Sequence, residues 1–161
     1  MRHVHNPMSD LIDGVWIKRL RVIPDERGRL MEILRADDER FTRFGQVYLS
    51  TTSPGVVKAW HLHRVQDDNF CCVRGMVKLV LYDDREGSPT RGTLSEYFIG
   101  EHNPLLVRVP AGVLHGWKCV SQEEAFVINA PNEPYRAEEP DEHRLPWNSP
   151  EVPYSWDVVF K

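Results

Sequence analysis

The sequence lacks any apolar run long enough to cross a membrane, and its first residues lack the apolar core of a secretory signal. It also has little cysteine, only the adjacent Cys71 and Cys72 and the distant Cys119. Adjacent residues of a strand point to opposite faces, so this pattern suits neither a disulfide framework nor a shared metal site. We therefore expect reduced cysteines in a cytoplasmic protein without a membrane segment.

Neither sign of charge dominates. The 20 Lys and Arg residues and the 24 Asp and Glu residues are interspersed and give a net charge of −4. Nucleic-acid-binding proteins usually carry a basic stripe, so no nucleic-acid partner is expected. Internal repeats and low-complexity runs are also missing. A length of 161 residues with 41% apolar residues is typical of one folded domain.

Short segments of alternating polarity, separated by turn residues, predict an all-β barrel or sandwich. Residues 1–10 are expected to form a flexible lead-in, and the proline-rich residues 131–161 an extended tail packed on the barrel, so that residues 1–161 make one domain. One or two helical turns are predicted at residues 37–43. Strands are predicted at residues 11–22, 29–34, 46–52, 56–63, 69–74, 76–83, 93–99, 105–109, 112–120 and 125–130, with a turn at 23–28.

Residues 55–75 concentrate side chains that bind metals or transfer protons. His61 and His63 are two apart, so on a strand both rings face the same side. Asp68 follows where the chain should enter its next strand, and a Pro-x-Gly turn brings His115 toward the same space. Three imidazoles and a carboxylate around one cavity suit either a metal site or an acid/base site.

These spacings resemble the two motifs of the cupin superfamily. Gly55, His61, His63 and Gly75 match the motif G-x5-H-x-H-x4-E-x6-G, with Asp68 in place of Glu. Pro110, Gly112 and His115 match the motif P-x-G-x2-H. The resemblance implies an all-β cupin jelly-roll barrel with the histidines in its mouth.

Further motifs lie between about Val22 and Trp156. They are D-x-R-G-x-x-x-E at residues 25–32, F-x-Q-x-N at 44–48 with Tyr48 in place of Asn, R-G-L-H-x-Q at 58–63, V-D-x-R-x-x-S-P-T-x-G at 82–92 and P-x-G-x-x-H-G-F at 110–117. This set resembles the dTDP-4-dehydrorhamnose 3,5-epimerase family. The resemblance implies epimerisation of a nucleotide-linked 4-keto-6-deoxysugar in polysaccharide or deoxysugar biosynthesis, with no cofactor, by a homodimer.

The same resemblance implies roles for individual residues. His61 is the base that removes protons beside the C4 ketone, and Lys58 and Arg27 contact the diphosphate. Arg27 and Glu32 would reach the pocket of the partner subunit. The remaining expected substrate-binding residues are Gln46, His63, Asn129 and Tyr135.

Several positions depart from the family pattern. Asp68 stands where the family has the lysine opposite the enolate, Asn129 where it has the tyrosine acid, and the carboxylate that partners the base would follow the last residue given. Asp68, or a water held by His115, would then act as the acid, which makes the expected catalytic set His61, Asp68 and His115.

Two alternatives remain open. His63 and Asp68 together restore a metal-binding cupin pattern, so one divalent metal ion bound by His61, His63, Asp68 and His115 is the first alternative. A non-catalytic nucleotide-sugar-binding module is the second. Without a metal, Asp68 should raise the pKa of His61 or His63, because an opposite charge favours the protonated imidazole.

Overall fold

The computed structural model describes residues 11–160, so the lead-in expected at residues 1–10 lies outside the described part. Among residues 11–160 no helix is long and apolar enough to cross a membrane. The strands are β1 (Trp16–Arg19), β2 (Val22–Asp25), β3 (Gly28–Met31), β4 (Tyr48–Thr52), β5 (Val57–Leu62), β6 (Asp68–Arg74), β7 (Met76–Tyr82), β8 (Leu94–Gly100), β9 (Leu105–Val109), β10 (Leu114–Cys119), β11 (Ala125–Asn129) and β12 (His143–Arg144).

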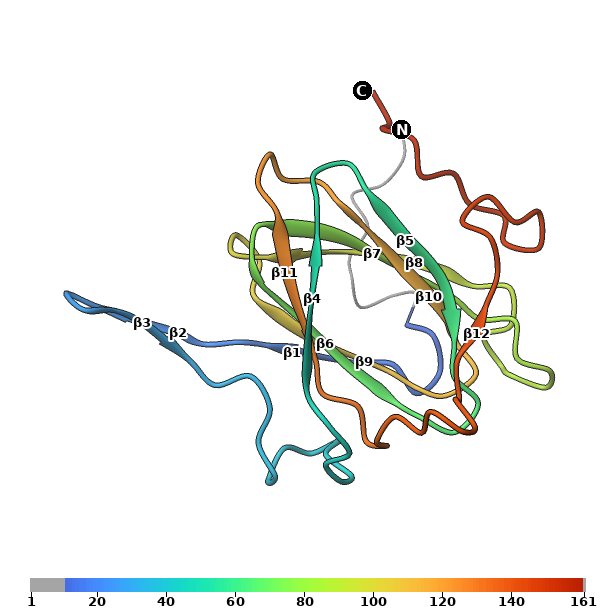
Figure 1. The fold of residues 1–161 in the computed structure, drawn as a ribbon, viewed down its shortest axis with the longest axis horizontal. Helices are drawn as coiled ribbons and strands as arrows, with labels where there is room; N and C mark the ends of the chain where they lie inside the picture. Colours follow the sequence, from blue (N-terminus) through green and yellow to red (C-terminus); the bar gives the residue numbers. More distant parts are fainter. Residues whose placement is uncertain (1–10, 161) are drawn as a thin grey trace.

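Two five-stranded antiparallel sheets face each other (Figure 1). One has the order β1-β9-β6-β11-β4 and the other the order β12-β5-β10-β7-β8. The chain crosses between them at Gly75, where a φ of 68° favours glycine and an added Cβ would lie 2.7 Å from Ser121 Oγ. The all-β jelly-roll arrangement predicted from the sequence is confirmed.

The inward faces of the two sheets form the main core. Alternate side chains of each strand point inward, so β6, β7, β9, β10 and β11 each contribute at every second position. Phe70, Leu79, Val107, Trp117 and Val127 are all less than 5% exposed. Phe70 and Trp117 of this core also line the cavity described below, so the core forms part of its wall.

The N-terminal region differs from the prediction. The predicted first strand is interrupted after β1, where Leu20 is buried and donates its backbone N–H to Pro104 O over 3.0 Å. The predicted turn at 23–28 and the first part of the predicted strand 29–34 form the β2–β3 hairpin, whose reversal lies at Glu26 and Arg27. The reversal therefore lies inside the predicted turn, but residues 23–25 and Gly28 pair as strand residues, which local alternation did not indicate because β-propensity depends on tertiary context.

The predicted helical turns at residues 37–43 are wrong. Asp38 Oδ2 instead accepts the backbone N–H of Arg35 over 2.9 Å, and both carboxylate oxygens bind Lys18 Nζ, at 2.6 and 2.7 Å. A short acidic side chain that binds nearby backbone groups competes with helix formation.

Residues 130–160 run back over the second sheet, where β12 pairs with β5 (Figure 1). Trp60 and Leu145 exchange backbone hydrogen bonds at 3.0 and 3.1 Å. Val152 and Trp156 are buried against Trp60 in a second apolar cluster on the outer face of this sheet. Residues 130–160, which we call the late segment, therefore hold β5, the strand that carries His61, in place.

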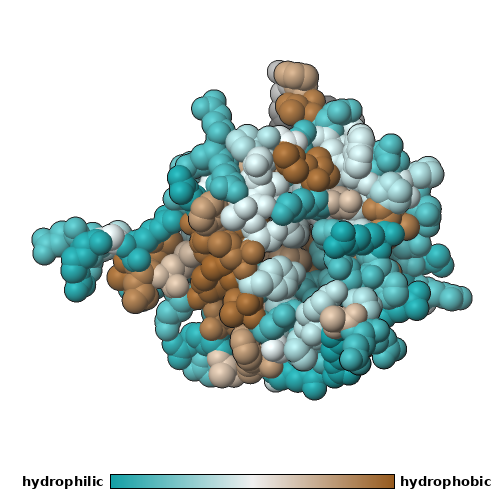
Figure 2. Space-filling model, viewed as in Figure 1, coloured by the Kyte–Doolittle hydropathy of each residue, from teal (hydrophilic) through white to brown (hydrophobic). Residues whose placement is uncertain are grey.

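The β2–β3 hairpin projects away from the two sheets (Figure 1). Figure 2 shows hydrophobic surface gathered where the hairpin meets the body, and hydrophilic surface at the hairpin tip. Ile23 and Leu30 of the hairpin and Val47 and Leu49 in or beside β4 are exposed apolar residues. Because β4 is an edge strand, this apolar surface lies beside an unpaired sheet edge.

Candidate functional site

A cavity of about 1210 Å³ opens between the ends of the two sheets and the late segment. Its walls come from residues 46–50, from β5 and β10, and from residues 133–147. The volume exceeds the range of roughly 300–1,000 Å³ that is usual for small-molecule sites. The cavity therefore has room for a ligand built of more than one part.

His61, His63 and His115 all line this cavity, as the motif spacing predicted. His61 lies on β5 and is the register partner of His115 on β10. His63 follows the end of β5, and its backbone carbonyl accepts the Gly112 N–H over 2.7 Å. Gly112 has a φ of 86°, so the Pro-x-Gly turn joins the two histidine motifs directly.

Asp141 fixes the loop that carries His63. Its carboxylate accepts the backbone N–H groups of Arg64, Val65 and Gln66 over 2.8, 2.8 and 2.9 Å. These bonds outweigh the effect of partial burial and lower the pKa of Asp141. The backbone carbonyl of Asp141 also accepts a hydrogen bond from His63 Nδ1.

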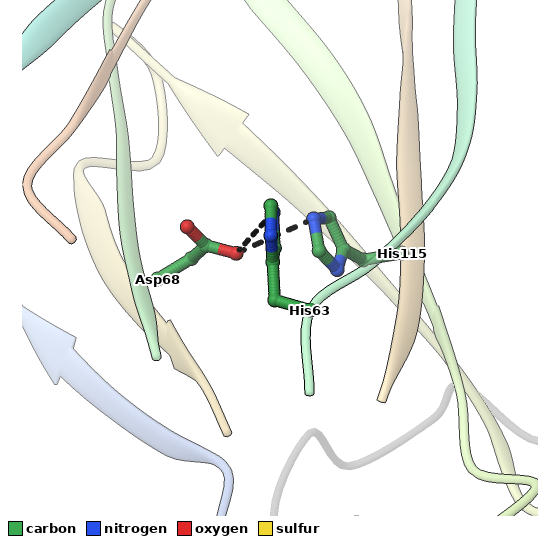
Figure 3. A group of neighbouring side chains, drawn as sticks. All are labelled: His63, Asp68 and His115. Carbon is green, nitrogen blue, oxygen red and sulfur yellow. Dashed lines mark ion pairs between the residues drawn. The ribbon is translucent and has the colours of Figure 1, made fainter. Parts of the chain in front are cut away.

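The Asp68 carboxylate is directed at two histidine rings (Figure 3). Asp68 Oδ2 lies 3.4 Å from His63 Nε2 and 3.5 Å from His115 Nε2. Asp68 Oδ1 accepts hydrogen bonds of 2.7 Å each from Gln66 Nε2 and Asn129 Nδ2. The carboxylate is 1% exposed, so these neighbours provide its surroundings in place of bulk water.

The structure separates His61 from the other three expected metal ligands. Ligand atoms of His63, Asp68 and His115 all lie within 4.8 Å of one another, and His61 is not part of this group. The His61 ring meets the His115 ring edge-on, with centroids 5.9 Å apart. The four-residue metal set predicted from the sequence is thus reduced to three residues.

Burial, followed by the nearby His115, lowers the pKa of His61 to about 4. The expectation that Asp68 raises the pKa of His61 is therefore wrong, because Asp68 pairs with the other two histidines. Burial also lowers the pKa of His115, against the opposing effect of Asp68.

Asn129 lies at the expected site but does not line the cavity. Its Nδ2 donates to Asp68 Oδ1 over 2.7 Å and to the Tyr48 hydroxyl over 2.9 Å, and its Oδ1 accepts the Asn69 N–H. Tyr48 and Asn129 are directly paired in the β4–β11 ladder. Tyr48 therefore places a phenol in the cavity at the position paired with Asn129.

The other predicted substrate-binding residues divide into two groups. Gln46, Lys58 and Tyr135 line the cavity. Arg27, at the hairpin tip, and Glu32, which pairs with Arg35 at 2.6 Å, are exposed and do not line it. One chain alone therefore does not bring Arg27 and Glu32 to this site.

Tyr48, Gln66 and Asp141 were not predicted as site residues. Two departures from the resembled family motifs, Tyr48 in place of asparagine and Asn129 in place of tyrosine, could have drawn attention to this pair. Asp141 gave no comparable signal, because it acts on His63 through a backbone carbonyl 78 residues away.

Residues 10–161 match the family model described as dTDP-4-dehydrorhamnose 3,5-epimerase. Among curated proteins, the chain is 38% identical to the spore coat polysaccharide biosynthesis protein SpsL of Bacillus subtilis, over 94% of this chain and 100% of that protein. It is 41% identical to the probable low-salt glycan biosynthesis epimerase Agl13 of Haloferax volcanii, over 91% of this chain and 96% of that protein.

Solved structures agree with these matches. The crystal structure of a dTDP sugar isomerase from Desulfovibrio desulfuricans G20 is 36% identical and superposes with a TM-score of 0.85, covering 90% of this chain and 92% of that chain. NovW, a 4-keto-6-deoxy sugar epimerase from Streptomyces spheroides, is 29% identical with a TM-score of 0.81, covering 91% of this chain and 76% of that chain.

Proposed function

Because the chain belongs to the dTDP-4-dehydrorhamnose 3,5-epimerase family, we propose that it inverts a carbon beside the ketone of a nucleotide-linked 4-keto-6-deoxysugar. It is thus an isomerase of deoxysugar or glycan biosynthesis. The observation that carries this proposal is a single cavity with an imidazole on one sheet and a phenol on the other, His61 on β5 and Tyr48 on β4.

The reaction needs a base and a proton donor that reach one carbon from two sides. His61 takes the proton from the carbon beside the ketone, and the electron pair of the broken C–H bond forms the enolate. The Tyr48 hydroxyl then returns a proton to the same carbon. One proton leaves the sugar and one arrives, so only its configuration changes; His61 then releases its proton to water and Tyr48 regains one from water.

Tyr48 is prepared to donate. Asn129 Nδ2 donates to the phenol oxygen over 2.9 Å, so the phenol's own proton is not used in this bond. Burial raises the pKa of Tyr48, which keeps the phenol protonated at neutral pH. Tyr48 thus takes the role of acid that the sequence suggested for Asp68 or for a water held by His115.

Several cationic and aromatic side chains suit the nucleotide. Diphosphate oxygens accept charge-assisted hydrogen bonds from lysine and arginine. Tyr135 is 61% exposed and Trp147 is 56% exposed, and both line the cavity, where a flat base can stack on them. The cationic side chains that line the cavity are Lys58, Arg64, Arg136 and Arg144.

We propose a homodimer that brings Arg27 and Glu32 of one chain to the cavity of the other. The projecting hairpin and the apolar surface beside the β4 edge support this arrangement. Light scattering that gives the mass of a single chain would contradict the dimer.

Proton removal and return require no redox cofactor. Three free, buried cysteines support a cytoplasmic location.

A solvent-exchange assay tests the function. The protein is incubated in D₂O with dTDP-linked 4-keto-6-deoxyglucose, and deuterium beside the ketone and the configuration of the product are followed by NMR. We expect deuterium to enter as the epimer forms. Binding without exchange would instead support the nucleotide-sugar-binding module.

The variant Tyr48→Phe separates the two proton transfers. It removes the donor but leaves the base, so we expect exchange into the starting sugar to continue while epimer formation falls about 10²-fold or more. Equal losses of exchange and inversion would remove Tyr48 from the donor role.

A further inference from the structure

Asp68 presents a negative charge that no lysine or arginine of the described residues neutralises. Its ion-pair neighbours within 4.0 Å are the rings of His63 and His115. Its two hydrogen bonds come from the neutral amides of Gln66 and Asn129, and both reach Oδ1. A buried carboxylate oxygen without a cation is costly, so a positive partner beside Oδ2 would stabilise this group.

Neither histidine ring, when neutral, can give Asp68 a hydrogen bond. His115 Nδ1 lies 3.1 Å from Val113 O, and His63 Nδ1 contacts Asp141 O. A carbonyl oxygen only accepts, so in both rings the proton sits on Nδ1 and Nε2 carries a lone pair. Two ring lone pairs and a carboxylate oxygen therefore face one another without a hydrogen between them (Figure 3).

We propose that His63 Nε2, His115 Nε2 and Asp68 Oδ2 bind a divalent transition-metal cation at the inner wall of the cavity. Ligands about 2.0–2.1 Å from a tetrahedral metal stand about 3.3–3.4 Å apart. The two separations to Asp68 Oδ2 are 3.4 and 3.5 Å, and all three ligand atoms lie within 4.8 Å of one another. The donor set needs little rearrangement to share one ion.

The surroundings of the three ligands also fit a metal. Histidine ligands usually donate their other ring N–H to a carbonyl or carboxylate, and ligating carboxylates are themselves hydrogen-bonded. Asp141 O and Val113 O provide these acceptors, and Gln66 and Asn129 hold the carboxylate. Two imidazoles favour Zn²⁺, Co²⁺ or Fe²⁺ over Mg²⁺ or Ca²⁺, which prefer oxygen.

This site gives the Asp68 position a role, and that role rests on the proposed function. A carboxylate at this position would by itself repel the oxyanion of the enolate. A cation held by Asp68, His63 and His115 restores positive charge on this side of the cavity. His63 and His115 both line the cavity, so an ion between them is open to a ligand.

Metal binding is measured directly, on the full chain without a histidine tag. After treatment with a chelator and dialysis, the protein is titrated with Co²⁺ and then with Zn²⁺, and bound metal is counted by mass spectrometry. We expect about one Co²⁺ per chain, with visible absorption of four- or five-coordinate Co²⁺, and displacement by Zn²⁺. Mg²⁺ should not compete.

Matched variants locate the ion. His63→Gln restores the residue of the family motif and Asp68→Asn keeps the shape of the carboxylate, and each should weaken Co²⁺ binding more than about 100-fold, because even outer-shell partners cost 10–100-fold. His102→Ala removes an exposed histidine outside the site and should change nothing. Unchanged far-ultraviolet circular dichroism controls for folding.

No Co²⁺ uptake, or uptake that survives both ligand variants, would overturn the site. Deuterium exchange by the metal-free protein at the full rate would leave the epimerase intact and remove the metal's role in it. Metal uptake without any exchange would leave the site intact and remove the proposed function.

Discussion

Among residues 11–160, Asp68 and Asp83 are almost completely buried, at 1% and 0% exposure, and their surroundings differ. Asp83 accepts hydrogen bonds from Arg85 Nε at 2.8 Å and from Ser88 Oγ and Thr90 Oγ1 at 2.6 Å each. We refer to Asp83, Arg85, Ser88 and Thr90 as the Asp83 cluster. Asp68 has two amide donors on one oxygen and two ring lone pairs facing the other.

The difference separates a structural carboxylate from a functional one. In the Asp83 cluster every oxygen has a donor and the charge has a guanidinium partner, which makes the group a rigid link between residues 83–92 and Asp13, whose carbonyl binds Arg85. At Asp68 the charge is held in place but not neutralised. This contrast is the basis on which we propose a ligand site at Asp68 and none at Asp83.

The largest expected effect is a loss of turnover when a residue of the cavity is changed. His61→Ala should lower turnover by about 10²–10⁴-fold, the usual contribution of a general base. The free energy of unfolding should change little, because His61 lies partly exposed on the cavity wall. Steady-state kinetics and urea unfolding of the same preparation measure both. Near-wild-type turnover would exclude His61 as the base.

The second prediction is the opposite result at Asp83, a loss of stability without a loss of turnover. Asp83→Ala leaves Arg85 without its buried partner, so the free energy of unfolding should fall by about 3 kcal/mol. Turnover of the folded fraction should remain as in the wild type, because no member of the Asp83 cluster lines the cavity. Chemical denaturation at 25 °C measures the first quantity.

Asp68→Asn is the matched control for that experiment. It keeps the acceptor for Gln66 and Asn129 but removes the unmatched charge, so stability should be equal to or greater than that of the metal-free wild type. A loss as large as that of Asp83→Ala would show that the two carboxylates have the same role.

Much of the fold and part of the candidate site could be predicted from local sequence. Alternation placed most strands of the two sheets, since one face of each strand is buried. The spacing of His61 and His63 placed both rings in one cavity, because the side-chain period of a strand is two. The Pro-x-Gly turn before His115 indicated that a third ring would join them.

The rest depended on contacts between distant residues. Tyr48 faces Asn129 only because β4 and β11 pair in one register, which neither strand specifies by itself. The tautomers of His63 and His115 are set by backbone carbonyls, which every residue type carries. His61 lies outside the group formed by His63, Asp68 and His115, and motif spacing does not resolve this difference.

The smallest expected effect is on how the free energy of unfolding changes at acidic pH. Burial opposes ionisation of Asp83, but the hydrogen bonds from Arg85, Ser88 and Thr90 outweigh it and hold the pKa of this carboxyl well below its ordinary value of about 3.9. The unfolded chain therefore takes up this proton at a higher pH than the folded protein does. The stability from Asp83 is full above about pH 5 and is lost as the pH falls through the lowered pKa.

Asp83→Asn should remove this part of the acid sensitivity. Its free energy of unfolding is expected to fall less steeply than that of the wild type between about pH 5 and pH 3, although Asp141, whose pKa is also lowered, keeps some slope in both proteins. Urea unfolding curves at pH 7, 5, 4 and 3 measure the two slopes. Parallel slopes would mean that the hydrogen bonds of Asp83 persist equally in the unfolded chain or do not favour its charged form, and the contrast with Asp68 would then rest on geometry alone.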